Sequence, residues 1–404
     1  RVLFRSIYDL VVIGGGPAGL AAGIYGGRAK MNVLVIEKST VGGRAYTTRE
    51  IVNYPGYNNS TGPILTGNMK EHAEAFGVKF TREEVKSVDF SGDIKVIKTK
   101  KNEYQAKAVI LATGTESRKL GIPGEKELTG QGVAYCATCD AEFFKDQEVV
   151  VVGSGDQAIE EGMYIAKFAS KITVIVLHDE GILDCNKQAA EKAFAHPKMN
   201  FVWNSVVSEI KGEDEVTGVV LKNMKTGELT DFPCQGIFFF VGMVPGTKFL
   251  GDAVELDKRG YVITNDSMET SVPGVYAAGD IREKYLRQVA TAVGDGATAA
   301  TAAERYIEEM EDFRKNVVES EKPVLMGFWC QDFNGSLDKM GAVDLANKNA
   351  GDKYKFIEVD YNRKRSMAKK FGIVIDPEKN AAVIELSRGQ KVRELDLNDR
   401  SEER

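Results

Sequence analysis

The stretch that decides the fold is "YDLVVIGGGPAGLAAGIYGGRAKMNVLVIEK", residues 8–38. It is typical of a strand, a tight loop, a helix and a second strand, because residues 10–13 are apolar and partly β-branched, as a buried parallel strand should be. Gly14, Gly16 and Gly19 then give the spacing G-x-G-x-x-G. Glycines at these positions allow a sharp turn and let backbone N–H groups approach a pyrophosphate. The stretch therefore predicts a dinucleotide-binding unit.

The helix and second strand of this unit supply the other groups that a dinucleotide needs. The helix is expected to begin near Pro17 and Ala18, so that its positive end points at the pyrophosphate. Glu37 closes the second strand, 23 residues after the first glycine, where an acid can accept hydrogen bonds from a ribose. The alternative is an ordinary glycine-rich turn. With both strands and the acid in place, we favour dinucleotide binding.

The pattern recurs in "QEVVVVGSGDQAIEEGMYIAKFASKITVIVL", residues 147–177. Here Gly153, Gly155 and Ala158 follow a second apolar strand. Two such units in one chain suggest two nucleotides, which we interpret as a bound flavin and a diffusing nicotinamide dinucleotide.

The second unit has an unusual chemistry for a nicotinamide site. Val176 stands where a ribose-binding acid is expected, and residues 172–186 contain no Arg or Lys to hold the 2′-phosphate of NADPH. Asp179 and Glu180 would repel that phosphate, although either can hold a bare ribose diol. Asp156 adds a carboxylate near the helix N-terminus and weakens binding if it points at the ligand. Whether NADPH or NADH binds here therefore stays open.

Two further segments indicate where a flavin is enclosed. Residues 108–117, "AVILATGTES", and 274–281, "GVYAAGDI", are each a short apolar strand that ends in a small, polar turn. The turn residues that permit close approach to a nucleotide are Thr113, Gly114, Gly279 and Asp280. From Arg287 a helix of small residues follows, and its first turn can present backbone N–H groups to a flavin ring. Together these segments favour a flavoprotein that binds FAD.

The chain resembles the low-molecular-weight thioredoxin reductases over residues 7–312. The resemblance rests on five motifs in the family's order, of which "CATCD" is the most specific: the first glycine loop, "ATG" at 112–114, "CATCD" at 136–140, "GSGDQA" at 153–158 and "GVYAAGD" at 274–280. "NYPG" at 53–56 and "RQVATAVGDG" at 287–296 are similar to the family's flavin-contacting segments. The resemblance thus adds Asn53, Arg287, Gln288 and Val289 to the residues expected at FAD.

The fold class that follows is α/β, with two Rossmann-like nucleotide-binding domains. The resemblance implies an FAD domain that is discontinuous, at 7–115 and 243–312, and a smaller NAD(P)H-binding-like domain with the CxxC at 116–242. It also implies a homodimer, and a rotation of the two domains between a flavin-reducing and a disulfide-presenting arrangement.

Cys136 and Cys139 allow two kinds of chemistry. A zinc site needs four ligands at short spacings, but the other cysteines, at 185, 234 and 330, are scattered and the three histidines form no ligand motif. Redox use is favoured, because the pair directly precedes the second glycine loop in a flavoprotein framework.

The resemblance assigns roles within this pair. It implies that Cys139 faces the flavin and that Cys136 attacks the protein substrate, a thioredoxin or a thioredoxin-like protein. Asp140 is the candidate general acid–base beside them. The alternative for Asp140 is a helix-start cap for "AEFFK", and the two roles are compatible.

A C-terminal segment, residues 318–398, resembles the thioredoxin fold without its chemistry. The similarity rests on "VLMGFW", "FIEVDYN", "AKKFGI" and Pro377, which falls where thioredoxins carry a cis-proline. Phe333 and Ser336 occupy the two cysteine positions of a thioredoxin, so this domain cannot carry electrons through its own disulfide. Cys330 is a lone thiol, either a buried strand-end residue or a site of mixed-disulfide formation. We expect a docking, dimerisation or specificity module.

Bulk composition excludes several partners. The chain has 404 residues, is 43% hydrophobic and carries a net charge of −6, which gives no electrostatic case for nucleic acid or anionic lipid. We expect no membrane segment, because no apolar run reaches the roughly 18 residues that a spanning helix needs. Five cysteines make no disulfide framework, and the first residues lead directly into a strand without a signal peptide. These features predict a reduced, cytoplasmic compartment.

Three functions are compatible with these residues. The first is a flavin oxidoreductase, a thioredoxin reductase-like enzyme that passes electrons from a donor through FAD and the Cys136–Cys139 pair to a thioredoxin-type disulfide. The second is the same core reduced by ferredoxin or NADH, which the missing arginines favour over NADPH. The third is a redox-sensing or scaffolding flavoprotein with little turnover, which the lost thioredoxin cysteines favour.

Overall fold

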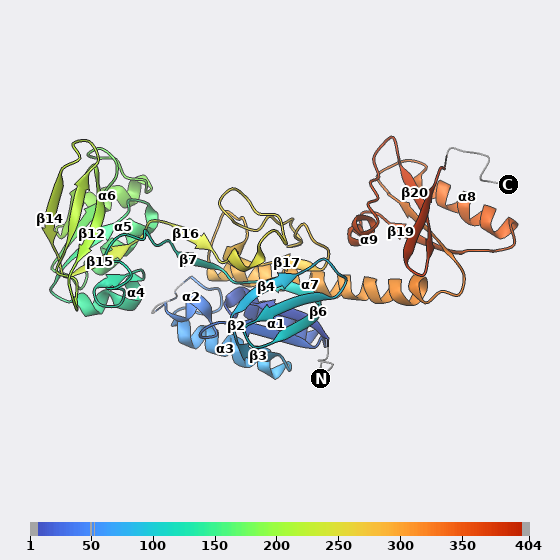
Figure 1. The fold of residues 1–404 in the computed structure, drawn as a ribbon, viewed down its shortest axis with the longest axis horizontal. Helices are drawn as coiled ribbons and strands as arrows, with labels where there is room; N and C mark the ends of the chain where they lie inside the picture. The colour runs from blue at the N-terminus through green and yellow to red at the C-terminus, as the bar shows by residue number, and fades with distance from the viewer. Residues whose placement is uncertain (1–6, 49–50, 52, 398–404) are drawn as a thin grey trace.

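The structure is a computed structural model that describes residues 7–48, 51 and 53–397. Residue 398, where the C-terminal domain is expected to end, lies outside the described residues. Three α/β bodies lie in a row (Figure 1): an inserted body at the left, a central body, and a C-terminal body at the right. The α/β class and the two nucleotide-binding folds are as the sequence predicts.

The central body is built on a seven-stranded sheet of order β3-β2-β1-β6-β5-β4, in which β17 also pairs with β6. β1 pairs in parallel with β2 and β6, whereas β4 and β5 form an antiparallel extension. Its strands are β1 (Tyr8–Ile13), β2 (Val33–Glu37), β3 (Lys79–Arg82), β4 (Val85–Asp89), β5 (Lys95–Thr99), β6 (Glu103–Leu111) and β17 (Val275–Ala277). Its helices are α1 (Pro17–Arg28), α2 (Gly43–Tyr46), α3 (Gly62–Ala75), η2 (Lys248–Leu250), η3 (Gly279–Ile281) and α7 (Val289–Phe313).

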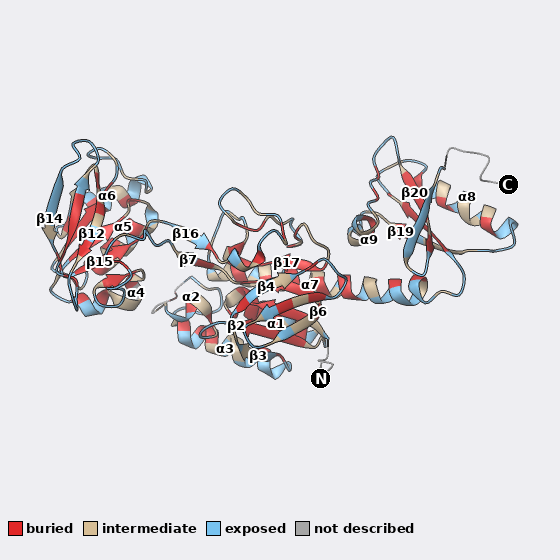
Figure 2. Cartoon of the chain, viewed as in Figure 1, coloured by how far each residue is buried: buried red, intermediate tan, exposed pale blue. Residues whose placement is uncertain are grey.

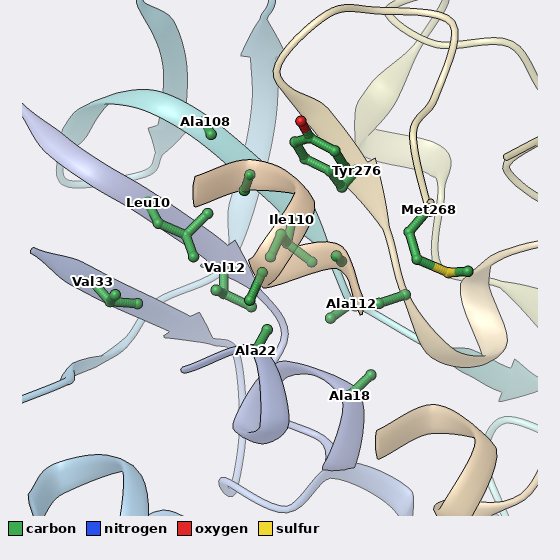
Figure 3. Close-up of a cluster of buried hydrophobic side chains, with 14 of the residues drawn as sticks. Leu10, Val12, Ala18, Ala22, Val33, Ala108, Ile110, Ala112, Met268 and Tyr276 are labelled. Carbon is green, nitrogen blue, oxygen red and sulfur yellow. The ribbon is translucent and has the colours of Figure 1, made fainter. Parts of the chain in front are cut away.

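The core of the central body fixes the position of the first glycine loop. Figure 3 shows side chains of β1, β6 and β17, among them Leu10, Ile110 and Tyr276, packed together in a buried cluster. Helix α7 packs closely on α1, because a Cβ at Gly296 would lie 2.1 Å from the carbonyl oxygen of Ala18. The start of α7 is thereby held beside the start of α1.

The inserted body contains a parallel sheet of order β11-β10-β9-β15-β8 and a separate antiparallel sheet of order β12-β13-β14. Its strands are β8 (Val133–Ala134), β9 (Glu148–Val152), β10 (Lys171–Ile175), β11 (Met199–Val202), β12 (Ser205–Lys211), β13 (Gly218–Asn223), β14 (Leu229–Pro233) and β15 (Gly236–Phe239). Its helices are α4 (Ala137–Asp140), η1 (Ala141–Phe144), α5 (Asp156–Ile165) and α6 (Lys187–Ala195). The antiparallel pair β7 (Thr115–Ser117) and β16 (Met243–Pro245) joins it to the central body.

The C-terminal body has a four-stranded sheet of order β19-β18-β20-β21. β18 is parallel to β19 and antiparallel to β20, and β20 is antiparallel to β21. Its elements are β18 (Val324–Trp329), α8 (Ser336–Asn349), β19 (Lys355–Asp360), α9 (Arg365–Lys370), β20 (Ala381–Ser387) and β21 (Gln390–Leu395). Helix α7 runs on into a π-helix, η4 (Arg314–Val318), whose Val317 joins Phe313 in the core of this body. The end of α7 is therefore part of the C-terminal body.

In the central and inserted bodies, the inner strands of the sheets are the most deeply buried elements. Figure 2 shows the inner strands, such as β2, β9, β10 and β15, as buried, whereas the outer strands β4 and β14 and the outer faces of the helices carry exposed residues. Among the described residues, no helix is both long enough and apolar enough to cross a bilayer. No described peptide bond is cis, so the bond before Pro377 is trans, unlike the cis-proline of the thioredoxins that the sequence resembles.

Candidate redox and nucleotide-binding site

The first glycine loop is shaped to receive a ligand. Gly14 has φ +111°, and a Cβ there would lie 2.3 Å from the carbonyl oxygen of Ala112; a Cβ at Gly19 would lie 1.9 Å from that of Gly14. At Gly16, by contrast, a Cβ would meet no described atom within 4 Å. Gly14 and Gly19 therefore allow the turn, while Gly16 faces open space at the start of α1, which begins at Pro17 with Ala18 buried behind it.

Glu37 lies at the end of β2, directly beside this loop. Its carboxylate is buried and accepts hydrogen bonds from the backbone N–H of Gly15 at 2.7 Å and from that of Ser39 at 2.9 Å. The acid that the sequence places at a ribose is thus fixed against the glycine loop by two backbone groups.

The other residues expected at FAD come from distant segments that meet at the carboxyl edge of the central sheet. β1, β6 and β17 are parallel neighbours, so the loops that follow them adjoin one another. These loops carry Gly14, the pair Thr113 and Gly114, and the pair Gly279 and Asp280. Asn53 also reaches this edge, because its amide donates a 3.1 Å hydrogen bond to the side chain of Gln288, the residue before Val289 at the start of α7.

Two buried polar groups at this edge have no protein partner among the described residues: Oδ1 of Asp280 and Nε of Arg287. Burial raises the pKa of Asp280, and the nearby cations of Lys284 and Arg287 oppose that rise. A buried polar atom without a hydrogen bond is costly and is usually satisfied by a ligand or water. The open glycine loop and these two groups therefore fit a dinucleotide such as FAD.

An ionic network missed by the sequence reasoning holds this edge together. Asp295 of α7 accepts from the backbone N–H of Gly279 at 3.0 Å and pairs with Lys284 at 2.7 Å and Arg282 at 3.4 Å. All three side chains are largely buried, so the network fixes the turn that carries Asp280. Asp295 sits in a run of small residues, but its partners are adjacent only in the folded chain.

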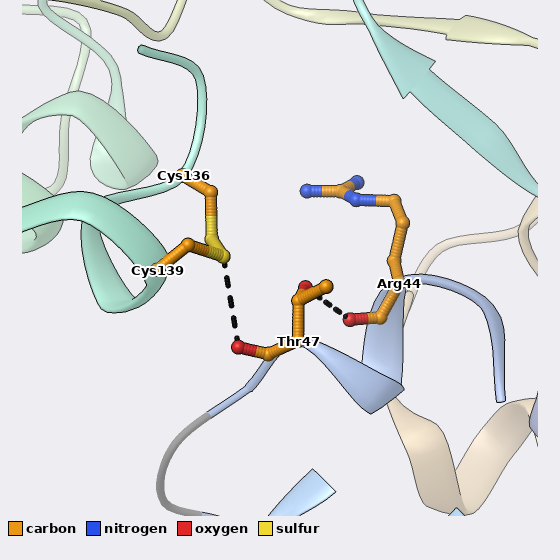
Figure 4. Close-up of a disulfide and its surroundings, with 4 residues drawn as sticks. All are labelled: Arg44, Thr47, Cys136 and Cys139. Atoms are coloured by element: carbon orange, nitrogen blue, oxygen red, sulfur yellow. Dashed lines mark hydrogen bonds between the residues drawn. A yellow bond between two sulfur atoms is a disulfide. The ribbon is translucent and has the colours of Figure 1, made fainter. Parts of the chain in front are cut away.

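Cys136 and Cys139 form a disulfide, with their Cα atoms 5.3 Å apart. Cys136 is the N-cap of α4, and Cys139 lies within that short helix. Sγ of Cys139 lies 3.6 Å from the carbonyl oxygen of Thr47, which follows α2 in the central body (Figure 4). The same figure shows the Arg44 side chain beside the disulfide. The pair therefore sits between the inserted body and the central body.

Asp140 ends α4 next to Cys139. Burial raises the pKa of its carboxyl group above the usual value for an aspartate. Its side chain makes no capping hydrogen bond at the start of η1, so the alternative prediction of a helix-start cap is wrong. A carboxyl group that keeps its proton to higher pH is suited to proton transfer.

Phe143, on the short helix η1 that follows the cysteine pair in the chain, is a further feature that the sequence reasoning missed. Its ring is 77% exposed on η1, whereas that of Phe144 is buried against Phe238. The signal in the sequence was the pair of phenylalanines after the cysteines, but which ring would point outward depended on packing. An exposed phenyl ring in the turn after the cysteine pair can offer an apolar contact to a protein partner.

The second glycine loop has the turn geometry of the first. Gly153 has φ +119°, and a Cβ there would lie 2.4 Å from the carbonyl oxygen of Phe240. Ala158 is fully buried behind it, and a Cβ at Gly155 would meet no described atom within 4 Å.

The side chains around this second loop are already engaged with one another. Ser154 donates to Asp184 at 2.8 Å, and Asp156 accepts from the backbone N–H of Asn186 at 2.7 Å. Asp179, considered above as a ribose acceptor, pairs with Lys225 from the turn between β13 and β14. Among the described residues, no group of three or more His, Cys, Asp or Glu side chains is placed to hold a metal ion.

Comparisons with known proteins agree with this arrangement. The family described as pyridine nucleotide-disulphide oxidoreductase matches residues 8–296. A thioredoxin reductase from Peptoclostridium acidaminophilum is 53% identical over 311 residues, which cover 75% of this chain and 98% of that protein. One from Bacillus subtilis (strain 168) is 45% identical over 314 residues, 78% of this chain and 99% of that protein.

Solved structures of thioredoxin reductases are similar to about three quarters of this chain. The thioredoxin reductase of Lactococcus lactis in its FR conformation has a TM-score of 0.68 at 44% identity and covers 75% of this chain and 99% of its own. That of T. acidophilum has a TM-score of 0.66 at 34% identity, with coverage of 76% and 100%. The family match ends at residue 296, before the C-terminal body begins.

Proposed function

The chain belongs to the pyridine nucleotide-disulphide oxidoreductase family and, within it, to the thioredoxin reductases, and we propose that it passes electrons through FAD and the Cys136–Cys139 pair to a thioredoxin-type protein disulfide. The observation that carries this proposal is the position of the disulfide, 3.6 Å from Thr47 of the body that contains the open glycine loop. A disulfide exchanging electrons with a flavin in one body and a protein in solution needs such a boundary position.

The chain's own residues would hold FAD at the carboxyl edge of the central sheet. The glycine loop would approach the pyrophosphate, Glu37 the ribose, and Asp280 and Arg287 would gain the partners that they lack within the described protein. The full set is Gly14, Gly16, Pro17, Ala18, Gly19, Glu37, Asn53, Thr113, Gly114, Gly279, Asp280, Arg287, Gln288 and Val289. When bound there, FAD supplies a carrier for two electrons.

The cysteines would act in order. With both thiols reduced, the thiolate of Cys136 attacks one sulfur of the partner's disulfide and releases the other as a thiol. Cys139 then attacks Cys136 in the mixed disulfide, which releases the second partner thiol and restores the Cys136–Cys139 disulfide. Asp140, with its raised pKa, would take up and return the proton. The contact of Cys139 with Thr47 supports its assignment to the flavin side.

Domain movement follows from the way in which the bodies are joined. The chain passes between the FAD domain, residues 7–115 and 243–312, and the inserted domain, residues 116–242, through the strands β7 and β16. We propose that the inserted domain rotates about this two-stranded link, so that the disulfide alternates between the flavin and the partner. Phe143, exposed on η1 after the cysteine pair, would contact the partner in the second arrangement.

We assign the C-terminal body, residues 318–398, to a thioredoxin-like domain without redox function. The sheet order β19-β18-β20-β21 supports this assignment. At one of the lost cysteine positions, Ser336 is buried and bridges the chain: it accepts from the backbone N–H of Cys330 at 2.8 Å and donates to the carbonyl oxygen of Asn380 at 2.6 Å. Cys330 is itself buried, which favours its structural role. Docking, dimerisation or specificity remains the proposed role.

The proposal also covers the electron donor, the protein partner, the oligomeric state and the cellular compartment. We propose a donor other than NADPH, with ferredoxin and NADH as the alternatives, because residues 172–186 carry no Arg or Lys. The proposed partner is a thioredoxin, the assembly a homodimer, and the compartment the cytoplasm, where the thiols of Cys185, Cys234 and Cys330 would stay reduced.

The experiment that tests this function bypasses the unknown donor. The FAD-loaded chain is reduced anaerobically with dithionite, freed of excess reductant, and mixed with an oxidised thioredoxin. We expect one thioredoxin disulfide to be reduced for each Cys136–Cys139 pair reoxidised. Failure of the reduced protein to transfer electrons to thioredoxin would leave the sensing or scaffolding role as the better account.

A further inference from the structure

The two glycine loops of this chain differ in whether an acidic residue lies in the first turn of the helix that follows the loop. The first turn of α1 contains no acidic residue, and its N-cap, Gly16, faces open space. The first turn of α5 begins with Asp156. The positive end of a helix attracts an anion only if no carboxylate already occupies it. The second loop thus has a carboxylate on the first residue of its helix, beside the position where a pyrophosphate would lie.

A second carboxylate approaches the same loop from the segment after β10. Oδ2 of Asp184 accepts hydrogen bonds from the Ser154 hydroxyl at 2.8 Å and lies 2.9 Å from Nε2 of His178. The bonds from Ser154 and His178 hold the pKa of Asp184 below its usual value, so this carboxylate is charged at neutral pH. Ser154 is the middle residue of Gly153-Ser154-Gly155, the part of the loop that would otherwise approach a phosphate.

The segment carrying Asp184 is fixed at its far end as well. Asp156 accepts from both the backbone N–H and the side-chain amide of Asn186, at 2.7 and 2.8 Å. Asn186 in turn caps α6, accepting from the backbone N–H of Ala189 at 2.9 Å. Three hydrogen bonds therefore keep residues 178–186 against the glycine loop, and the cap that Asn186 provides anchors the end of this segment to α6.

No positive charge compensates these acids within the segment, because residues 172–186 contain no Arg or Lys. Lys225 does reach the segment, but it pairs with Asp179 instead. A nicotinamide dinucleotide would bring its own negative pyrophosphate against the exposed carboxylates of Asp156 and Asp184, and these like charges repel. The residues present therefore do not fit the nucleotide that this fold usually holds.

We infer that the second glycine loop excludes nicotinamide dinucleotides, NADPH and NADH alike, and that Asp156 and Asp184 are the residues that determine this exclusion. The inference rests on the proposed function, since it concerns the donor of that reaction. Of the donors considered above, reduced ferredoxin is the one that needs no dinucleotide loop.

The test is calorimetric titration of the FAD-loaded full chain with NADP⁺ and with NAD⁺, which bind without transferring electrons. The wild-type protein is expected to show no saturable binding below millimolar concentration. In Asp156→Asn/Asp184→Asn, the amides keep the acceptor oxygens for Ser154 and Asn186 but remove both charges. Affinity for both nucleotides should rise by roughly tenfold or more, since one lost repulsion of ordinary size changes affinity by that factor.

The matched control is Asp179→Asn, which removes a charge of the same segment that is already paired with Lys225. Its affinity for both nucleotides should equal that of the wild type. Micromolar binding of either nucleotide to the wild type would overturn the inference. So would a double variant that stays folded and yellow without binding more tightly.

Failure of the inference is distinguishable from failure of the proposed function. Transfer of electrons from the dithionite-reduced chain to thioredoxin depends on FAD and the cysteines and needs no nicotinamide dinucleotide. Normal transfer together with tight nucleotide binding would refute the inference alone. If the reduced chain transfers no electrons to thioredoxin, the proposed function is refuted, whether or not the chain binds either nucleotide.

Discussion

Sγ of Cys139 lies 3.6 Å from the carbonyl oxygen of Thr47, so a sulfur atom of the inserted body rests against the body that carries the first glycine loop (Figure 4). The two residues are 92 positions apart in the chain. Their contact gives the CxxC motif a neighbour in the central body, to which we assign the bound FAD.

Cys136→Ser should retain the FAD absorbance of the purified protein and lose thioredoxin reduction, because Cys139 alone cannot restore a disulfide within the pair. We expect the rate of thioredoxin reduction by the dithionite-reduced chain to fall to background. Cys330→Ser is the matched control: that thiol is buried in the C-terminal body, so its replacement should leave the rate unchanged. Equal rates for Cys136→Ser and wild type would remove the cysteine pair from the reaction.

Gly16→Val should fold but release FAD. The backbone of Gly16 is extended, at φ −75° and ψ −176°, which valine adopts readily, and a Cβ there meets no described atom within 4 Å. The added methyl groups would therefore occupy only the space assigned to the pyrophosphate. Far-UV circular dichroism should be unchanged while the ratio of flavin to protein absorbance falls. Gly67→Val, at another open glycine, serves as control and should stay yellow; a yellow Gly16→Val would place the nucleotide elsewhere.

Asp140→Asn should slow dithiol–disulfide exchange without affecting FAD content. Burial raises the pKa of Asp140, so the carboxyl group retains a proton to higher pH and can donate it to a leaving thiolate. Removal of a general acid–base typically costs 10²- to 10⁴-fold in rate. The wild-type rate should decline as pH rises through the raised pKa, and the variant should lack that decline. A variant with the wild-type pH profile would assign Asp140 a structural role only.

How much of this was predictable depends on how far apart in the sequence the partners lie. The glycine loops, Glu37 and the cysteine pair were recognisable because each is a local pattern with fixed spacing. Ser154 and Asp184 are 30 residues apart, and their hydrogen bond exists only once the segment after β10 folds back over the loop. Asp179 and Lys225 are likewise far apart in the sequence, and they form an ion pair only in the folded chain. The alternative role of Asp140 as a helix-start cap was wrong, because a suitable residue type does not ensure the hydrogen bond.

Phe143→Ala should raise the KM for thioredoxin while leaving turnover of a small aromatic disulfide unchanged. The ring is 77% exposed on η1, which follows the cysteine pair, and truncation of an aromatic anchor residue of a protein interface costs more than about 1 kcal/mol, roughly a fivefold to tenfold change in affinity. Leu229→Ala, an exposed apolar residue of β14, is the control and should leave both substrates unaffected. Equal effects on the small disulfide would mean that Phe143 supports the cysteines rather than the partner.

Glu309 should make the attachment of the C-terminal body sensitive to pH. It lies on α7 near Glu269 of the central body and Lys364 of the C-terminal body, and burial raises its pKa from 4.5 to about 7. Because the folded state holds this proton more tightly than the unfolded state, stability falls as pH rises from 4.5 to about 7 and is constant above that range. Glu309→Gln should flatten this dependence.

The measurement is urea unfolding at several pH values, followed by the fluorescence of Trp329 in a Trp203→Phe background. Glu308→Gln removes the neighbouring exposed carboxylate on the same helix and should retain the wild-type slope. A Glu309→Gln variant with the wild-type dependence of midpoint on pH would show that another group governs it.

The central claim is that two sulfur atoms exchange electrons with a bound flavin, and anaerobic reductive titration tests it most directly. FAD-loaded wild type and Cys136→Ser/Cys139→Ser are titrated with dithionite while flavin absorbance is followed to complete bleaching. The wild type should consume two more electrons per chain than the double variant, because its disulfide is a two-electron acceptor. Identical consumption by the two proteins, or a purified chain that carries no FAD, would contradict the claim.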